Sequence, residues 1–536
     1  MNGYLILSLL LVPLIGAGVG AFVPRAMARH FAHVVSLITL AIAGVMALLF
    51  HFHESGMQFQ YDGFQLEAIH FHFALGIDAI SLWLVVLTAL LTPLAISFSY
   101  ESIKDRELEY YSWTLLLLAA MLGVFISRDL LLFYVFFELT LIPMFFIIGI
   151  WGGPERRFAA GKFFLFTFTG SVFTLAAAIY LGLRAGTFDI ATIVHVAQND
   201  LSDTERLWVL LGFLAGFSVK VPLFPVHTWL PLAHTEAPTA GSVILAGVLL
   251  KLGTYGLLRL AVPIGLISID GVAFPTALRV IGVLCVIGVI YGALVAWVQP
   301  DIKKLVAYSS VSHLGFCVLG MIALNDYGMQ GSVLYMINHG LSTGALFLVI
   351  GMIYDRYHTR DINELSGLAR RMPILSFFFV LFALSSIGLP GLNGFVSEFL
   401  TILGAFTSPY LGISFGAFAA LGIILGAVYM LHMLARVVWG PLKVPVVHDE
   451  HGGHGPPPGD IGHHEIGILL PLAVAVIVLG VAPTPLLHSI LAPVEAIRRP
   501  IAVQYDVQSH DMKQKLAKAP AAPRPMGRPV LAEAKP

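Results

Sequence analysis

The sequence has very little charge. Only 11% of its 536 residues are Asp, Glu, Lys or Arg, whereas 58% are hydrophobic, and the mean hydropathy is +0.87. A soluble protein of this size needs far more charged surface than this chain supplies. The formal net charge of −1 also excludes a basic field that would attract nucleic acid. The composition therefore indicates an integral membrane protein in a lipid bilayer.

Cysteine is almost absent from the chain. The two cysteines, Cys285 and Cys317, both lie inside apolar runs, so we interpret them as buried packing residues. The sequence contains no CxxC or CxxCH motif, so neither an iron–sulfur cluster nor a c-type haem is expected on it.

Long apolar runs recur along the whole chain. Each is about 20 residues long, which is the length that spans a bilayer as a helix. The first run starts near Met1 without a basic leader, so we predict a first transmembrane helix and not a cleaved signal. We predict fourteen spanning helices, at residues 4–23, 31–52, 76–98, 111–127, 129–150, 162–184, 207–226, 237–260, 275–298, 305–323, 330–353, 373–403, 410–436 and 466–484.

Lysine and arginine mark one side of the predicted bundle. The loops after odd-numbered helices carry 14 of them, and the loops after even-numbered helices, up to the twelfth, carry 4. The positive-inside rule therefore places the odd-numbered loops in the cytoplasm. We predict a multi-pass protein of the bacterial inner membrane, with the N-terminus and the C-terminus on the outer, periplasmic side. Eight basic residues in the tail, from Arg498 to Lys535, disagree, but most lie far from the last helix, where the rule is weak.

Few charged residues remain inside the predicted helices. Lys162 and Arg279 lie near helix ends, where their side chains can extend to the interface. Lys220 and Lys251 lie well inside their helices, where a lysine costs about 2.5–3.5 kcal/mol on insertion scales. Such a cost favours a functional role over a purely structural ion pair. Glu138, alone among Phe and Leu, needs a partner, and Lys220 is the natural candidate.

Two predicted helices are interrupted by proline near a buried charge. Pro222 and Pro225 follow Lys220 in the seventh helix, and Pro390 precedes Glu398 in the twelfth. Broken spans survive only where protein or water covers the freed backbone. Two broken helices five spans apart are typical of inverted-repeat transporters. We therefore predict an all-α integral membrane fold of about fourteen transmembrane helices, with two inverted five-helix repeats and broken helices 7 and 12.

These patterns divide the chain into segments. We predict three N-terminal helices at 1–110, the two repeats at 111–262 and 263–440, a His/Gly/Pro-rich loop at 441–465, the last helix at 466–484, and a polar tail at 485–536 that is disordered from about Asp511. A metal site in the loop is the alternative to a solvated segment, which we favour because its histidines fit no compact ligand spacing. These histidines are His448, His451, His454, His463 and His464.

Several other acids and histidines have a purely structural interpretation as well as a functional one. Asp78 and Asp129 start predicted helices, so we interpret them as N-terminal caps. His313 and His339, in the tenth and eleventh helices, are each either a proton carrier or a hydrogen-bonded core residue, and a bis-histidine haem is a third reading. Many hydroxyl and amide side chains surround them, which favours a hydrated path. His227 and His234 fall in the predicted loop after helix seven. They either form a cytoplasmic entrance to the proton path or are ordinary loop residues.

The buried ionisable residues together form a candidate proton relay. Its members are Glu138, Lys220, Lys251, His313, His339 and Glu398. Burial disfavours a charged lysine and a nearby carboxylate favours it, so a change in the Glu138–Lys220 distance alters the proton affinity of the lysine. Such a switch requires no redox centre.

At these residues the sequence resembles a known family. The segment from Phe217 to Gly256 resembles the core signature of the antiporter-like subunits of complex I, the proton-translocating NADH:quinone oxidoreductase. FYVFFELTLIPMF around Glu138 and VAYSSVSHLGF around His313 resemble the same family, over residues 70 to 440 in all. Within that family, Glu398 in the broken twelfth helix is typical of the M type, since the L and N types have lysine there.

The resemblance implies a proton-translocating subunit with its redox chemistry elsewhere. Glu138 and Lys220 would be the switch pair, Lys251, His313 and His339 would lie on the central hydrophilic axis, and Glu398 would be the terminal site. No cofactor is expected on this chain, because flavin, iron–sulfur clusters and quinone are bound by other subunits of the family's complex. The implied partners are the L-type and N-type subunits and the small membrane subunits.

Three other readings remain open. A subunit of a multisubunit cation/proton antiporter or of a membrane-bound hydrogenase shares the family's fold, although Glu398 in place of lysine disfavours the antiporter. A structural scaffold of the membrane arm would use the buried charges only to align helices. A metabolite carrier would need a polar substrate site apart from the charged axis, and the sequence indicates none.

Overall fold

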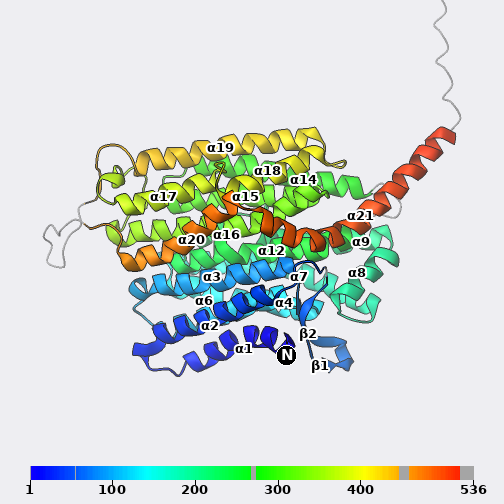
Figure 1. The fold of residues 1–536 in the computed structure, drawn as a ribbon, viewed down its shortest axis with the longest axis horizontal. Helices are drawn as coiled ribbons and strands as arrows, with labels where there is room; N and C mark the ends of the chain where they lie inside the picture. The colour runs from blue at the N-terminus through cyan, green and yellow to red at the C-terminus, as the bar shows by residue number, and fades with distance from the viewer. Residues whose placement is uncertain (1, 55, 267–272, 446–457, 519–536) are drawn as a thin grey trace, which may run out of the picture.

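The computed structural model describes residues 2–54, 56–266, 273–445 and 458–518. In these residues the protein is a bundle of helices that lie side by side along its longest axis (Figure 1). Twelve of the described helices are long and apolar enough to cross a membrane. The broken seventh and twelfth spanning helices are not among these twelve. Adding them is consistent with the fourteen membrane crossings expected. The expectation of a multi-pass α-helical membrane protein is therefore confirmed.

The N-terminal unit combines three long helices with a β-hairpin. The helices are α1 (Asn2–Gly20), α2 (Ala28–Leu49) and α3 (Ala79–Ser102), and the antiparallel strands are β1 (Gln58–Leu66) and β2 (Phe71–Ile77). The hairpin, which was not predicted, lies mainly in the loop predicted between the second and third helices, and the third helix begins at Ala79 instead of residue 76. Aromatic residues that alternate with polar ones, as in QFQY and FHFA, favour this pleated structure. Asp78 accepts a hydrogen bond from Ser81 N, which confirms its capping role.

The first repeat contains the broken seventh helix. Its elements are α4 (Glu107–Ile126), α5 (Leu130–Leu139), α6 (Leu141–Trp151), α7 (Arg156–Ala185), α8 (Ile190–Asn199), α9 (Asp203–Lys220), α10 (Leu230–Glu236), α11 (Thr239–Ile244), η3 (Leu245–Leu249), α12 (Leu250–Gly256), η4 (Leu257–Ala261) and α13 (Val262–Gly265). The short helix α8 was not predicted. Helix seven continues through α10, so the predicted end at residue 226 is wrong. Asp129 caps α5, as predicted.

The second repeat contains the broken twelfth helix. Its elements are α14 (Ala273–Trp297), α15 (Ile302–Ile322), α16 (Asp326–Tyr357), η5 (Leu368–Arg370), α17 (Pro373–Ser386), α18 (Asn393–Thr407) and α19 (Ile413–Val437). The break between α17 and α18 spans residues 387–392, around the proline that the sequence marked.

A pair of matching backbone bridges shows the inverted symmetry of the repeats. Asp129, at the start of α5, is bridged to Asp189, before α8, and Asp301, at the start of α15, is bridged to Asp361. Each aspartate at the helix start also caps its helix by accepting two backbone hydrogen bonds. Because five crossings separate α5 from α15, the two bridges lie on opposite sides of the membrane. The same local structure therefore occurs twice, inverted.

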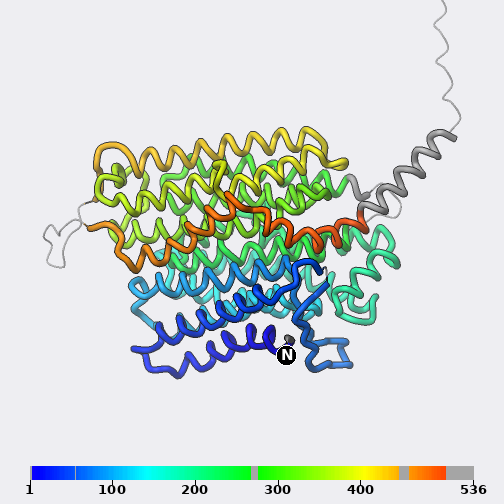
Figure 2. Tube along the Cα trace, viewed as in Figure 1, coloured from blue at the N-terminus to red at the C-terminus, as the bar shows by residue number. Residues whose placement is uncertain are grey.

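The C-terminal part of the described chain is helical. Helix α20 (His463–Val481) is followed by α21 (Thr484–Lys518), which packs against α16, α3 and α13 (Figure 2). The predicted tail therefore includes a helix up to Lys518. Three loop histidines, His448, His451 and His454, lie outside the described residues. His463 and His464 begin α20, and the His464 ring bonds Ser97 Oγ at 2.9 Å. Within the described chain, no three His, Cys, Asp or Glu side chains are placed to hold a metal ion.

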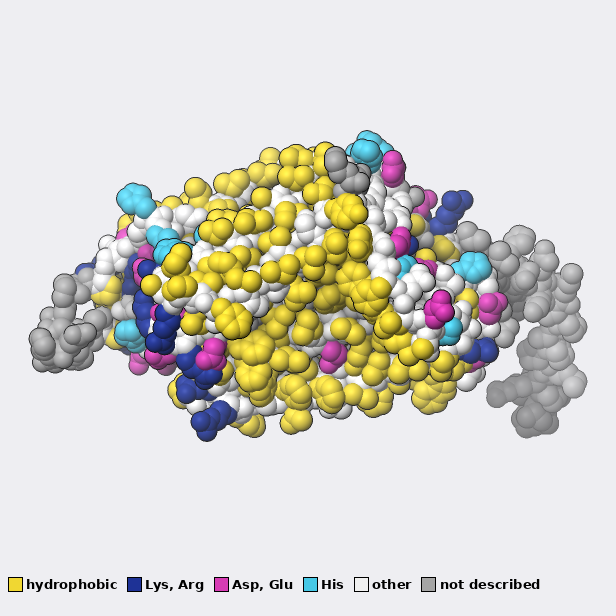
Figure 3. Space-filling view, turned by 90° about the horizontal axis from the view of Figure 1, so that it is seen from below, with side chains coloured by type: hydrophobic (Ala, Val, Ile, Leu, Met, Phe, Trp, Pro, Cys, Tyr) yellow, Lys and Arg dark blue, Asp and Glu magenta, His cyan; other side chains and the backbone are white. Residues whose placement is uncertain are grey.

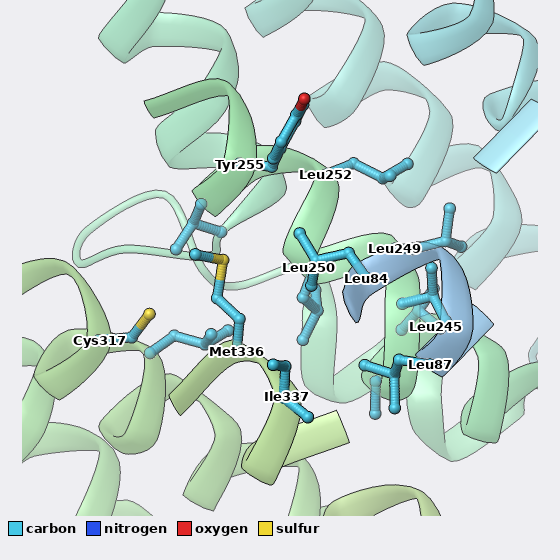
Figure 4. Close-up of a cluster of buried hydrophobic side chains, with 14 of the residues drawn as sticks. Leu84, Leu87, Leu245, Leu249, Leu250, Leu252, Tyr255, Cys317, Met336 and Ile337 are labelled. Atoms are coloured by element: carbon cyan, nitrogen blue, oxygen red, sulfur yellow. The ribbon is translucent and has the colours of Figure 1, made fainter. Parts of the chain in front are cut away.

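Apolar packing holds the middle of the bundle together. Leucines of α3 and of the eighth spanning helix, which runs from α11 to α13, pack against Met336 and Ile337 of α16 and Cys317 of α15 (Figure 4). Cys285 and Cys317 are both buried free thiols, as predicted. On the outside, a broad band of hydrophobic side chains crosses the surface between two polar ends (Figure 3). The polar residues described next are therefore enclosed in an apolar shell.

Candidate functional site

Glu398 lies at the end of a hydrogen-bonded group in the second repeat. Its side chain projects from α18, and the residue is 5% exposed. Tyr335 of α16 donates its hydroxyl to Glu398 Oε1 at 2.9 Å, and the same hydroxyl lies 2.7 Å from Nδ1 of His313 on α15. The direct distance from His313 Nδ1 to Glu398 Oε1 is 3.6 Å. Tyr335, which the sequence reasoning missed, therefore bridges two predicted relay residues.

The break in helix twelve makes room for the Glu398 carboxylate. Gly388 lies in this break and has a φ of +73°, a conformation that glycine adopts without strain. A side chain at Gly388 would overlap Oε2 of Glu398. The glycine that the sequence marked as loosening the helix is thus a contact of the buried acid.

His313 has polar contacts on both ring nitrogens. Its Nε2 lies 3.3 Å from Ser386 Oγ and 3.3 Å from the hydroxyl of Tyr429. Its ring centre lies 5.7 Å from that of His339 on α16, in an edge-on arrangement. The two histidines therefore form neighbouring stations, as the relay prediction requires, and no space for a haem separates their rings.

Lys251 is the most deeply buried of the relay residues. Its Nζ lies 2.8 Å from His339 Nδ1 and also bonds Ala246 O. Ala246 belongs to η3, a π-helical turn that precedes the lysine in the eighth helix. Single π turns within α-helices are frequent at functional sites. His339 Nε2 is buried and has no hydrogen-bond partner in the described residues, so it is available to a mobile water.

The predicted pair of Glu138 and Lys220 lies in the first repeat. Lys220 is 3% exposed and donates a hydrogen bond of 3.1 Å to Thr140 Oγ1, and its Nζ lies 4.7 Å from the ring centre of Phe137. Glu138 and Lys220 interact through their charges, but in the described residues no ion pair within 4.0 Å joins them. Thr140 lies between α5 and α6, which together form one membrane-spanning segment, so the lysine binds the middle of the fifth span.

The structure does not join Lys220 to Lys251 directly. The two helices that carry them are in close contact, since a Cβ on Gly253 would lie 3.0 Å from Lys220 Cβ and 2.7 Å from Val221. No hydrogen bond between described residues connects the two amines. A proton passing between them therefore needs water, which bridges polar groups at little energetic cost.

Polar side chains surround the second-repeat group. Asn338 Nδ2 donates to Asn393 O at 2.6 Å and to Ser397 Oγ at 3.1 Å, and Ser342 Oγ lies 2.6 Å from Ser385 Oγ. A cavity of about 10 Å³ lies among these residues, His313, His339 and Glu398. That volume is about the minimum for one water molecule. The hydrated path favoured by the sequence is compatible with this packing.

Four basic or titratable residues that were assigned to loops lie within the helical bundle instead, and three of them, His227, His234 and Lys303, are buried. His234 lies in α10, fully buried, with its ring stacked on Phe347 at 4.6 Å between centres. Arg259 lies in η4 and forms an ion pair with Asp78, and Lys303 begins α15 and donates to Ala237 O at 2.6 Å. His227 is also buried, in the break of helix seven, and its ring lies 5.2 Å from that of Tyr291. In the sequence, the helical spacing of the apolar residues Trp229, Leu230 and Ala233 was the pattern that could have indicated α10.

An inverted-repeat bundle with broken helices and a buried axis of Lys, His and Glu defines the class, an antiporter-like membrane subunit. The family described as NADH:quinone oxidoreductase/Mrp antiporter, transmembrane, matches residues 127–423. The chain belongs to this family. A chain of respiratory complex I from Thermus thermophilus, solved with bound NADH, has the same fold with a TM-score of 0.82 and 29% identity, and covers 92% of this chain and 99% of that one.

Curated relatives identify the type of subunit within this family. NADH-quinone oxidoreductase subunit M of Rhodobacter capsulatus is 41% identical over 490 residues, which cover 88% of this chain and 92% of the relative. NADH-ubiquinone oxidoreductase chain 4 of Marchantia polymorpha is 41% identical over 484 residues, covering 89% and 93%. Within its family the chain is therefore of the subunit M (chain 4) type, which confirms the expected type. The Mrp complex of Dietzia sp., at 22% identity and a TM-score of 0.81 over 94% of this chain and 99% of that one, shares the fold.

Proposed function

We propose that this chain translocates protons as a membrane-arm subunit of a respiratory NADH:quinone oxidoreductase. The observation that carries the proposal is the contact series from Lys251 through His339 and His313 to Tyr335 and Glu398. Its hydrogen bonds measure 2.7–2.9 Å, and one ring-to-ring step joins the two histidines. Ionisable residues inside a membrane bundle are costly, and in such positions they mark ion pathways.

The side chains support a stepwise transfer of one proton. A protonated Lys251 donates to His339 Nδ1, and the neutral histidine releases a proton from Nε2 to a water, which passes it to His313. His313 passes a proton to the Tyr335 oxygen while Tyr335 gives its own to Glu398. Each group then returns to its starting tautomer by a rotation or by exchange with water. The path needs no change of oxidation state in this chain.

The driving reaction belongs to other chains of the complex. We infer that flavin, iron–sulfur clusters and quinone are held by partner subunits, and that the L-type, N-type and small membrane subunits flank this one. The relatives carry the names of NADH:quinone oxidoreductase subunits, and a T. thermophilus complex I chain shares the fold. On this reading the chain contributes to the enzyme as a translocating subunit, and not as a site of electron transfer.

We infer the orientation from the charges at the two ends. Lys and Arg side chains gather toward one end of the bundle, on the left in Figure 3. The positive-inside rule assigns that end to the cytoplasm of a bacterial inner membrane. The β-hairpin of residues 58–77, at the opposite end, then faces the periplasm together with the N-terminus.

Substitution of Glu398 tests the proposed function. Glu398→Gln keeps the size and the hydrogen bond to Tyr335 but cannot titrate, so proton uptake per NADH oxidised should fall. Glu398→Asp retains the acid and should preserve more pumping. The assay is proton uptake and NADH:quinone turnover in vesicles, after assembly of all subunits has been verified. Normal pumping by the assembled Gln variant would remove Glu398 from the relay.

A further inference from the structure

A groove runs along the outside of the bundle between α7 and α9, which are in direct contact with each other. Its volume is about 600 Å³. The lining contains three small residues, Ala176, Gly212 and Ala215, and two large apolar ones, Phe173 and Trp208. Phe173 and Trp208 are 55% and 69% exposed, so they face the bilayer and not the core of the bundle. The groove therefore belongs to the apolar outer surface of the first repeat.

The two helices approach each other closely at the groove. A Cβ added to Gly212 would lie 2.9 Å from Ala177 Cβ and 3.0 Å from Phe173 O. Small residues allow helices in a membrane to come this close. The hollow that remains on the outer side has the size of a pocket for a small ligand. An apolar hollow loses dispersion contacts unless an apolar group fills it, so this groove favours an apolar occupant.

Charged residues lie at one end of the groove. Arg184 is in the last turn of α7, and Glu205 is in the first turn of α9. Arg184 Nη2 donates to Glu205 Oε1 at 3.1 Å, and the Tyr180 hydroxyl donates to the same oxygen. Ser202 donates to Oε2 from its backbone N at 2.8 Å and from its Oγ at 2.7 Å. Both carboxylate oxygens therefore accept hydrogen bonds, which fixes the position of Glu205.

Arg184 has more hydrogen-bond donors than Glu205 can accept. A guanidinium has five N–H donors, and the side chain of Arg184 is 48% exposed. Arginine binds phosphate through two parallel N–H bonds, for which its planar shape is suited. The ion pair with Glu205 keeps the guanidinium beside the groove and has no net charge. A phosphate-containing headgroup without net charge is therefore favoured over an anionic one.

Aromatic residues indicate how deep the groove lies in the membrane. Tyr180 and Trp208 line its charged end, where Trp208 follows Glu205 by about one helical turn. Tyrosine and tryptophan are enriched at the boundary between membrane and water. The lining then continues along both helices to Phe173 and Ala215, away from the charged end. The groove thus combines a cation at the level of lipid headgroups with an apolar surface at the depth of acyl chains.

We propose that the α7–α9 groove binds one acyl chain of a phospholipid with a zwitterionic headgroup, and that Arg184 binds the phosphate of this lipid. The site does not depend on the proton relay, so it goes beyond the proposed function. Because the lipid contacts both helices, it holds α9, the helix that ends at Lys220, against α7.

Photolabelling tests whether an acyl chain occupies the groove. The assembled complex is placed in phosphatidylcholine nanodiscs that contain phosphatidylcholine with a diazirine in its acyl chain, and labelled peptides are identified by mass spectrometry. Ala176→Trp places a large side chain in the groove, and Ala176 is exposed, so the core is not disturbed. Labelling of α7 and α9 should fall several-fold in this variant. Ile179→Trp, at an exposed position of α7 outside the lining, is the matched control and should be labelled like the parent.

Variants of Arg184 test recognition of the phosphate. Arg184→Gln should lower labelling by the phosphatidylcholine probe several-fold, whereas Arg184→Lys keeps the charge and should retain most of it. A fatty acid with the same diazirine but no phosphate should label the groove less, and Arg184→Gln should not change that labelling. The fold around Glu205 should persist in these variants, since Ser202 and Tyr180 still bind its carboxylate.

Each part of the proposal has an outcome that would overturn it. Equal labelling of the parent and Ala176→Trp would show that no acyl chain occupies the groove. A loss in Ala176→Trp without any loss in Arg184→Gln would overturn the phosphate site. Stronger labelling by a phosphatidylglycerol probe than by phosphatidylcholine would overturn the preference for a zwitterionic lipid. Labelling of the isolated full chain but not of the assembled complex would mean that a partner subunit, and not a lipid, covers the groove.

Discussion

Removal of one hydroxyl tests the second half of the relay most directly. Tyr335→Phe deletes the only group that contacts both His313 Nδ1 and Glu398 Oε1 at hydrogen-bond distance in the described residues, and it leaves a gap of 3.6 Å between them. The ring itself should stay in place, because it stacks on Phe316 at 6.3 Å with a 10° angle between planes. The substitution therefore separates the proton path from the packing.

The size of the effect follows from the lost hydrogen bond. A hydrogen bond to a charged group contributes about 1.5–3 kcal/mol, and each 1.4 kcal/mol changes a rate about tenfold. Proton transfer between His313 and Glu398 should therefore slow by about 10- to 100-fold, unless a water takes the place of the hydroxyl. Tyr429→Phe is the matched control. It removes a hydroxyl that contacts His313 at Nε2 and not at Nδ1, so its effect should be clearly smaller.

The assay is NADH-driven proton uptake and NADH:quinone turnover in vesicles with the complete complex. Pumping per NADH should fall in Tyr335→Phe, with subunit assembly unchanged. Equal pumping by the parent and Tyr335→Phe would show that Tyr335 is not on the path. Equal losses in Tyr335→Phe and Tyr429→Phe would show that general disturbance around His313, and not a missing bridge, causes the defect.

Three further predictions concern other parts of the chain. Lys220→Ala should nearly abolish pumping, and Lys220→Arg should impair it too, since arginine keeps its charge at any accessible pH; full pumping by the assembled Arg variant would favour a scaffold. Replacement of the five histidines of the His-rich segment by Ser should leave activity unchanged, and a large loss that added zinc reverses would indicate a metal site. Cysteine labelling should place the Arg156–Arg157 loop in the cytoplasm and the Phe52–Gly76 segment outside, and the opposite pattern would invert the orientation.

The sequence predicted the membrane bundle and drew attention to the ionisable residues inside it because both depend on local composition. A lysine or glutamate within an apolar run is visible wherever the chain folds. The breaks around Pro222 and Pro390 were equally visible, since proline disrupts a helix through its own covalent geometry. The caps at Asp78 and Asp129 needed only a carboxylate before an apolar run.

The residues that the sequence reasoning missed depend on packing between distant segments. Tyr335 and Tyr429 read as ordinary core aromatics, and only the meeting of α15, α16, α18 and α19 turns their hydroxyls toward His313. Arg259 and Lys303 were counted with the loops because both lie at the ends of predicted helices. Their partners, Asp78 and the carbonyl of Ala237, come from other helices. Hydropathy along one segment carries no information about such partners.

The two repeats have similar backbone geometry at their broken helices, but they carry different ionisable side chains there. In the two broken helices, Leu223 N bonds Ser218 O at 2.9 Å, and Leu389 N bonds Leu384 O at 3.1 Å, so the breaks begin in the same way. By that alignment the position of Lys220 is occupied in the second repeat by Ser386, which contacts His313. In the second repeat the ionisable residue is instead Glu398, which follows the break and lies in α18.

An amine in one repeat and a carboxylate in the other have very different ordinary proton affinities. A proton does not cross between them in both directions unless contacts around each group change. Thr140 and Phe137 hold Lys220, whereas Tyr335 holds Glu398. The first set lies on the fifth helix and the second on α16. We therefore predict that any coupling to partner subunits moves these helices relative to the broken ones, because these contacts influence how strongly each group binds its proton.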